Sequence, residues 1–174
     1  MGIISTIIYN IKNMKKAKQF RNMGKDNLLA LHDETFYEAI ECMCEDAVYD
    51  IQEPTLTEEQ VLLYSLCRFE AEVNNGGLCQ FFVNSSSECA PYIATALEAI
   101  GATDLKRIFV KFVEGNQIDV NNLDSFKVES IEEFVEQTKR YDFDSFDEQF
   151  YNDEILHQQI IDYARKHIDQ IMKA

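Results

Sequence analysis

Histidine and cysteine, the residues that most often carry catalysis, are few in this sequence and are not spaced for it. The three histidines, His32, His157 and His167, form no nucleophile–base or metalloprotease pattern. Glu154 and His157 make one Glu-x-x-His pair, which is half of the ligand set of a di-iron helical bundle, and the second half is missing. The sequence therefore predicts a non-enzymatic protein with no metal and no other cofactor.

The five cysteines lie in apolar stretches rather than at metal-binding spacings. On a helix, Cys42 and Cys44 would place their thiols about 200° apart, too far to bind one metal ion together. An odd number of cysteines and the lack of a secretory leader indicate reduced, buried thiols in a cytoplasmic protein. The remaining cysteines are Cys67, Cys79 and Cys89.

Carboxylates are the chemistry that this sequence has in excess. It contains 31 Asp and Glu against 16 Lys and Arg, a net charge of −15. Residues 1–25 contain six basic and no acidic side chains, so residues 26–174, with 10 basic against 31 acidic, have a net charge of −21. Such a field repels nucleic acid and anionic membranes and attracts basic partners. We therefore expect a basic protein partner and no direct binding to nucleic acid.

Two groups of glutamates recur at helical spacing. The first follows one side of a helix expected over residues 33–51, and no Lys or Arg occurs between residues 26 and 67 to pair with it. The second belongs to a helix expected over residues 130–140. One carboxylate per roughly 3 Å of such a face is of the same order as the phosphate charge of duplex DNA, about one per 1.7 Å. With acids further along the chain they form the candidate partner-binding face: Glu34, Glu38, Glu41, Glu45, Glu129, Glu132, Glu133, Glu136, Asp142, Asp144, Asp147 and Glu148. The alternative is a solvated acidic surface without a partner.

The elements that must position these residues are helices. Only 6 Gly and 2 Pro occur, too few turn residues for an all-β fold, and apolar residues recur at helical spacing. We expect an all-α protein, a single compact multi-helix domain of about seven to nine helices. Its parts are a basic amphipathic N-terminal helix in residues 1–25, whose apolar run is too broken to span a membrane, and an acidic all-helical domain over residues 26–174.

The expected helix boundaries follow from caps and breakers. Thr57-Glu58-Glu59-Gln60 and Ser130-Ile131-Glu132-Glu133 have the form of capping boxes, and Gly101 and Gly115 close helices. Further helices are expected over residues 88–100, 103–114 (capped by Thr103) and 153–172, with a loop over 116–127.

Asn74-Asn75-Gly76-Gly77 must be a turn, and two structures fit it. Asn-Gly between apolar runs is typical of a β-hairpin. The apolar run before the turn is far longer than a strand, however, and residues 78–83 do not alternate. A helix-turn-helix is therefore favoured.

The same region carries a resemblance. The string EVNNGGLCQFFVNSS at residues 72–86, ALEAIGA at 96–102 and FDSFDEQFY at 143–151 resemble the bacterial DNA-mimic protein family, whose members share the DNA-mimic protein C-terminal domain. The resemblance covers about residues 57–166. It implies an all-α bacterial protein that binds a DNA-binding transcription regulator in place of DNA, often as a homodimer. Within the motif, the residues expected to build and support the turn are Asn74, Asn75, Gly76, Gly77, Gln80, Phe81, Phe82 and Asn84, the amides of Gln80 and Asn84 bonding buried backbone.

Two alternatives to DNA mimicry stay open at this point. One is a small-ligand or peptide pocket around the turn, with Tyr64, Gln80 and Asn84 as polar anchors. The other is an immunity protein that neutralises a basic nuclease toxin, which would use the same charge.

Overall fold

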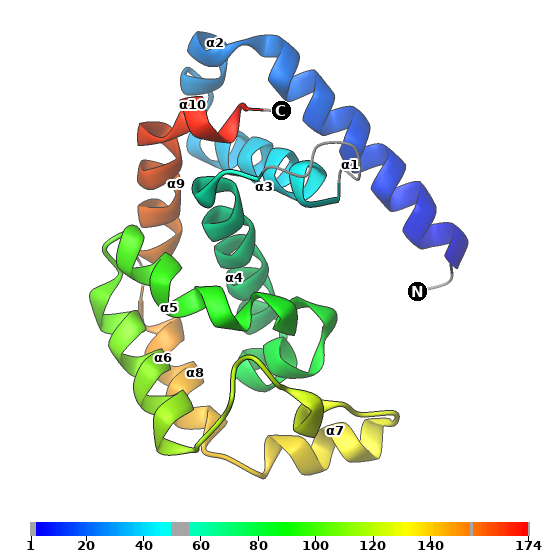
Figure 1. The fold of residues 1–174 in the computed structure, drawn as a ribbon, viewed down its shortest axis with the longest axis vertical. Helices are drawn as coiled ribbons and strands as arrows, with labels where there is room; N and C mark the ends of the chain where they lie inside the picture. Colours follow the sequence, from blue (N-terminus) through cyan, green and yellow to red (C-terminus); the bar gives the residue numbers. More distant parts are fainter. Residues whose placement is uncertain (1–2, 50–55, 154, 174) are drawn as a thin grey trace. The chain divides into compact units, whose positions relative to one another are not determined.

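The computed structural model describes residues 3–49, 56–153 and 155–173, with residues 3–11 as backbone only (Figure 1). All regular secondary structure in these parts is helical, with ten α-helices and two 3-10 helices. Eight of the α-helices have at least seven residues, so the all-α prediction and the expected number of helices are confirmed. No helix among the described residues is both long and apolar enough to cross a membrane.

The chain divides into two compact units. The terminal unit comprises Met1–Tyr64 and Ile160–Ala174, and the central unit comprises Ser65–Gln159. Both boundaries fall inside helices, one in α4 (Glu58–Val83) and one in α9 (Leu156–Lys166). The predicted division of the chain at residue 25 is a different one, and it stays a prediction.

In the terminal unit, α1 (Ile3–Met23) packs along α3 (Asp33–Tyr49), with the short α2 (Lys25–Leu29) between them in sequence (Figure 1). The apolar side of α3 is buried, with Phe36, Ile40 and Met43 at its centre. Met14, at the end of the apolar stripe expected on the N-terminal helix, is exposed, and the isoleucines of that stripe lie outside the described side chains. The expected end of the α3 helix at residue 51 also lies outside the described residues.

The side chains of Thr57 and Gln60 cap the start of α4, and Gln60 also bonds the end of the last helix. The predicted capping box is confirmed, because the Thr57 N–H donates to Gln60 Oε1 at 2.9 Å and the Gln60 N–H donates to Thr57 Oγ1 at 3.2 Å. The Gln60 amide also donates to the carbonyls of Ile171 and Lys173, at 3.0 and 2.7 Å. These bonds satisfy carbonyl groups that have no partner within the last helix.

The prediction of a single final helix over residues 153–172 is wrong. The structure has α9, a break at His167, and the short α10 (Ile168–Ile171). No glycine or proline marks the break. The His167 ring instead stacks on Tyr163, with ring centroids 4.2 Å apart, and its Nδ1 lies 3.6 Å from Glu59. The stack on Tyr163 is a local contact four residues back, whereas Glu59 is distant in sequence, and a single-helix periodicity does not report such a long-range contact.

The central unit surrounds an aromatic core. It contains the rest of α4, then η1 (Ser85–Cys89), α5 (Ala90–Ala99), α6 (Thr103–Gly115), η2 (Asp124–Phe126), α7 (Ile131–Thr138) and α8 (Phe143–Tyr151). Phe69 contacts Phe81, Phe109 and Phe150 edge-on, at centroid distances of 5.1, 5.8 and 5.6 Å. Such edge-to-face pairs stabilise a core beyond their buried area. Phe81 and Phe82 of the motif are thus core residues.

The expected helix ends in this unit are confirmed in part. Gly101 follows α5 with a φ of 81°, the left-handed conformation that closes a helix. The Glu133 N–H donates to Ser130 Oγ at 3.2 Å, so Ser130 caps α7, which ends at Thr138 rather than at residue 140. Thr103 was expected to cap α6 and instead is its first helical residue, after Ala102, which has no side-chain oxygen. Residues 116–127 are a loop that contains η2.

All five cysteines are buried, and none forms a disulfide. This agrees with their prediction as reduced thiols in apolar surroundings.

Candidate functional site

The Asn-Gly-Gly motif forms a bend within α4. Gly76 has φ −165° and ψ 26°, and Gly77 has φ 78° and ψ 177°, so two helical halves meet there and the helix-turn-helix prediction is confirmed. Asn74 and Asn75 end the first half and are exposed. Glycine is required at position 77 for two reasons. Its φ is in the left-handed region, and a Cβ there would lie 2.2 Å from Asp147 Oδ2. At Gly76 the space is already filled, because a Cβ would lie 2.1 Å from Gln80 Oε1.

Asp147 caps the second half of α4. Its Oδ1 accepts the Leu78 N–H at 2.8 Å, which is one of the unpaired donors at the start of a helix. Burial raises the pKa of Asp147, the Leu78 bond lowers it, Asp144 raises it, and the net pKa lies above the ordinary value. Asp147 therefore lies against the bend, although the sequence placed it with the partner-binding acids.

Glu72 is the acceptor at the centre of the motif. Its Oε2 accepts the side-chain amides of Gln80 and Asn84, each at 2.8 Å, and its Oε1 accepts the Ser86 hydroxyl at 2.8 Å. The prediction that these two amides bond buried backbone is therefore wrong. The bend instead places both amides within hydrogen-bonding distance of the Glu72 carboxylate. Burial acts to raise the pKa of Glu72, but the bonds from Gln80, Ser86 and Asn84, with Arg68, outweigh it and lower the pKa.

The two longest segments of the resemblance meet at this bend. Besides the Asp147 cap, the Tyr151 hydroxyl donates to the Val73 carbonyl at 2.7 Å. The neighbouring Glu70, which is buried, lies 3.1 Å from His157 Nδ1. His157 thus has a carboxylate partner from α4, whereas Glu154 of the Glu-x-x-His pair lies outside the described residues. The shared motif is a structural cluster, and Glu72 and Ser86 are members of it that the sequence reasoning missed although both stand in the motif string.

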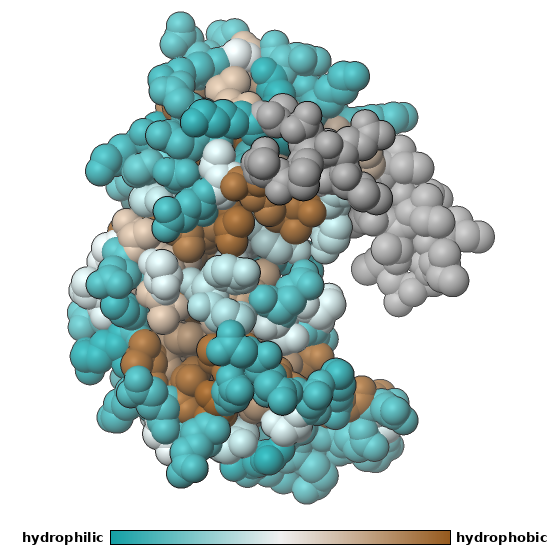
Figure 2. Space-filling model, in the orientation of Figure 1, coloured by the Kyte–Doolittle hydropathy of each residue, from teal (hydrophilic) through white to brown (hydrophobic). Residues whose placement is uncertain are grey.

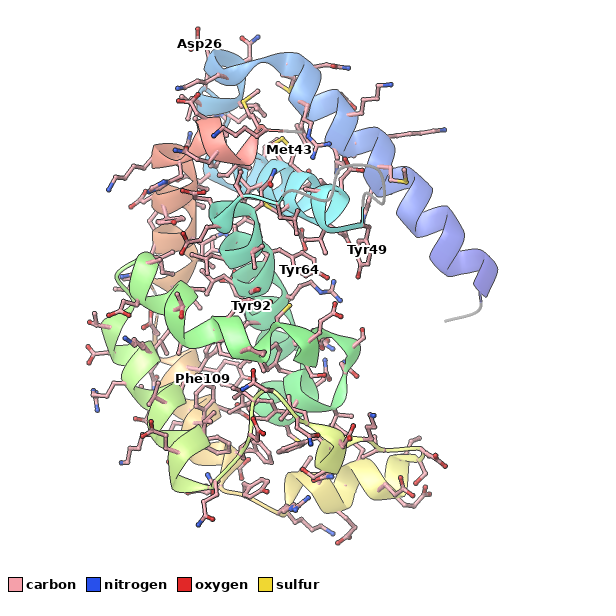
Figure 3. The ribbon with its side chains drawn as sticks, viewed as in Figure 1. Asp26, Met43, Tyr49, Tyr64, Tyr92 and Phe109 are labelled. Carbon is pink, nitrogen blue, oxygen red and sulfur yellow. The ribbon has the colours of Figure 1, made fainter. Side chains whose placement is uncertain are left out.

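No metal site is formed by the residues that the structure describes, among which no three His, Cys, Asp or Glu side chains come together. A surface groove of about 660 Å³ lies beside Asn84 and is also lined by Ser85, Asn121, Asn122 and Lys127. Of the three anchors proposed for a ligand pocket, only Asn84 lines it. Gln80 bonds Glu72, and the Tyr64 hydroxyl, in the terminal unit, lies 3.2 Å from that of Tyr49 (Figure 3).

The first group of glutamates lies beside basic residues of α1. Lys16 forms an ion pair with Glu38, and Arg21 forms one with Asp46. The Asn13 amide donates to Glu45 at 2.9 Å. The bond from Lys16 to Glu38 also raises the pKa of Lys16. The basic partners that the sequence lacks between residues 26 and 67 therefore come from the N-terminal helix. Of this group Glu34 is exposed, while Glu41 is half-buried.

The second group of glutamates, on and just before α7, is exposed to solvent. Glu129, Glu132, Glu133 and Glu136 are all exposed, and α7 has no buried residue. Glu136 pairs with Lys139 three residues on, at 2.8 Å, and Glu133 accepts the Glu129 N–H at 2.7 Å. No ion pair reaches Glu132 among the described residues.

The acids of α8 divide between structure and surface. Asp142 caps α8 by accepting the Ser145 N–H at 3.2 Å, and Asp147 caps α4. Asp144 and Glu148 are exposed, and no ion pair to either occurs within the described parts of the chain. The helix itself is marked by Phe143, Phe146 and Phe150 at core spacing, a signal that the sequence analysis did not use.

Charge is concentrated in the central unit. It contains 18 acidic and 7 basic residues, a net charge of −11, whereas the terminal unit contains 13 acidic and 9 basic residues, a net charge of −4. The basic N-terminal helix therefore compensates acids of its own unit.

Comparison with known protein families finds a match over most of the chain. The family model described as DMP19-like protein, that of DNA mimic protein 19, matches residues 54–167, which contain the bend of α4 and both α7 and α8. No curated protein and no solved structure matches the chain. Since the match extends over well more than half of the sequence, the chain belongs to the DMP19-like protein family.

Proposed function

We propose that this protein is a non-enzymatic DNA mimic, whose exposed carboxylates on α7 and α8 occupy the DNA-binding surface of a basic protein. The observation that carries the proposal is that Glu132, Asp144 and Glu148 are exposed and that none of them forms an ion pair with another described residue. Membership of the DMP19-like protein family also suggests a DNA-mimic role. The expected partner is a DNA-binding transcription regulator of a bacterial cytoplasm.

The physical basis is electrostatic. A DNA-binding protein presents Lys and Arg at the spacing of phosphates, and an acidic surface can take their place. The central unit has a net charge of −11, a field that speeds association with a cationic surface and weakens as salt is added. The glutamates of α3 are left out of the proposed surface. Glu38 and Glu45 already bond Lys16 and Asn13 of α1, and Glu41 is half-buried. Glu34 is exposed, but it belongs to the terminal unit, whose net charge is only −4.

The test compares two variants that each lose three negative charges. The central variant carries Glu132→Gln, Asp144→Asn and Glu148→Gln, and the control carries Asp26→Asn, Glu34→Gln and Glu58→Gln, all at exposed positions. The partner is captured from host lysate, and its affinity for each protein is then measured across a salt series with duplex DNA as competitor. We expect the central variant to bind at least about tenfold more weakly, with a flatter salt dependence, and the control to change less than about twofold.

Equal weakening by both variants would show a nonspecific effect of total charge and would contradict the proposal. Binding that DNA does not displace would contradict mimicry. A captured nuclease, inhibited by the protein, would instead support the immunity-protein alternative.

A further inference from the structure

An apolar ridge lies on the exposed side of α7. Ile131 is 79% exposed and Val135 is 42% exposed, on a helix that has no buried residue. Four residues apart, they lie on one side of the helix with about 6 Å between them along the axis. Single exposed aliphatic residues are ordinary, but two in register on a helix without a fully buried residue form a surface of their own.

The residues of α7 that contact the rest of the protein are on the side away from this ridge, so the ridge faces outward. The side chains that turn inward are Phe134, which is half-buried, and Gln137, whose amide donates to the Ser125 carbonyl. Glu132 and Glu136 follow the ridge residues by one position, so they form a second, acidic row about 100° further round the helix. The outer side of α7 is therefore an apolar row beside a parallel acidic row. On the face drawn in Figure 2, hydrophobic side chains lie among hydrophilic ones over the part of the central unit that contains α7.

We propose that α7 docks a basic partner surface that has an aliphatic centre, with Ile131 and Val135 as anchors and Glu132 and Glu136 as the charged rim. This inference rests on the proposed function and adds to it the chemistry of the partner. Phosphate mimicry alone needs only carboxylates. An apolar row beside them selects a helix or loop on which aliphatic side chains are flanked by Lys or Arg.

Charge complementarity favours this occupant over a second copy of the chain. A two-fold contact through the ridge would place the acidic rows of both copies in one interface. Like charges in an interface are unfavourable, and each central unit has a net charge of −11. The same charge repels nucleic acid and anionic lipid. The cationic side must therefore come from a protein.

The experiment uses two synthetic helical peptides of about 18 residues with equal numbers of Lys. One carries Leu along a single face, and the other carries Ser at those positions. Their affinities for the full-length protein are measured by fluorescence anisotropy at low and high salt. We expect the Leu/Lys peptide to bind about tenfold more tightly or better, and Ile131→Ser/Val135→Ser to remove this preference without changing the salt dependence.

Matched variants separate the two proposals. Glu132→Gln/Glu136→Gln should weaken both peptides and flatten the salt dependence, and Ile155→Ser, at another aliphatic residue that is 59% exposed, should change neither. If the Ile131→Ser/Val135→Ser variant keeps the preference for the Leu/Lys peptide, the ridge is not the anchor of the partner. The proposed function would then still stand. Unchanged affinity and salt dependence in the glutamine variant overturn the proposed function for this helix. A wild-type dimer that the serine variant converts to monomer, by analytical ultracentrifugation, overturns the choice of occupant.

Discussion

Two places in the central unit use carboxylates in opposite ways. At the bend of α4, Glu72 accepts three side-chain donors and Asp147 accepts the Leu78 N–H, so both are consumed by the fold. On α7, Glu132 is exposed and Glu136 meets only a lysine of its own helix end. The residue types are alike and the local sequences are similarly acidic. Only the donors that other segments bring to a carboxylate separate a structural acid from one that is available to a partner.

The largest effect that would test this contrast is expected at Gly77. Gly77→Ala should destabilise the protein by about 3 kcal/mol, because alanine is strained at φ 78° and its Cβ would meet Asp147. Gly101→Ala is the control, since its φ of 81° imposes the same strain and nothing lies within 4 Å of the added Cβ. It should cost only about 1 to 2 kcal/mol. Urea unfolding measures both, and equal losses would mean that Asp147 does not confine the bend.

Neutralising one acid at each place gives the next largest effect. Glu72→Gln should lower the free energy of unfolding by about 2 kcal/mol, because it removes the charge that accepts three hydrogen bonds and sets an NH₂ group among the donors. Glu132→Gln should stay within about 0.5 kcal/mol of the wild type. The assignment of Glu72 to the fold fails if the two variants unfold at the same urea concentration.

Proton linkage should distinguish even the two structural acids from each other. The pKa of Glu72 is lowered in the folded state, so its contribution to stability is present above its ordinary pKa of 4.5 and is lost as the pH falls below that value. The pKa of Asp147 is raised, so its contribution is present below its ordinary pKa of 3.8 and is lost as the pH rises through the higher folded value.

Unfolding free energies measured from about pH 6 down to about pH 3 check these signs. The gap between the wild type and Glu72→Gln should narrow on acidification. For Asp147→Asn, the stability of the variant relative to the wild type should fall over the same range. A gap for Glu72→Gln that widens toward low pH would contradict the donor arrangement around that carboxylate.

Local signals predicted much of the fold. The capping box at Thr57, the Ser130 cap, the closing Gly101 and the bend at Gly77 all depend on residues within a few positions of one another, and the structure has each of them. The reciprocal bond of the box predicted at Ser130 is missing, because Glu133 accepts the Glu129 N–H instead. Caps and breakers act through short-range backbone geometry, which a sequence displays directly.

Long-range partners are what the sequence did not display. Lys16 and Glu38 are 22 residues apart and Leu78 and Asp147 are 69 apart, so no local pattern links them. Glu59, which lies 3.6 Å from His167 Nδ1 at the break, is likewise distant in sequence. The partner-binding residues as a whole stay a prediction, because exposure shows which carboxylates are available and only a binding experiment shows which are used.

The buried thiols give this protein a built-in set of labels. Burial raises the pKa of Cys44 to about 12 and those of Cys42, Cys79 and Cys89 to about 11, so hardly any thiolate exists at neutral pH while the chain is folded. An alkylating reagent can then react only when a segment opens. Cys42 and Cys44 belong to the terminal unit and Cys79 and Cys89 to the central unit. Pulsed alkylation read by peptide mass would therefore report the opening rate of each unit separately, in the unmodified wild-type chain.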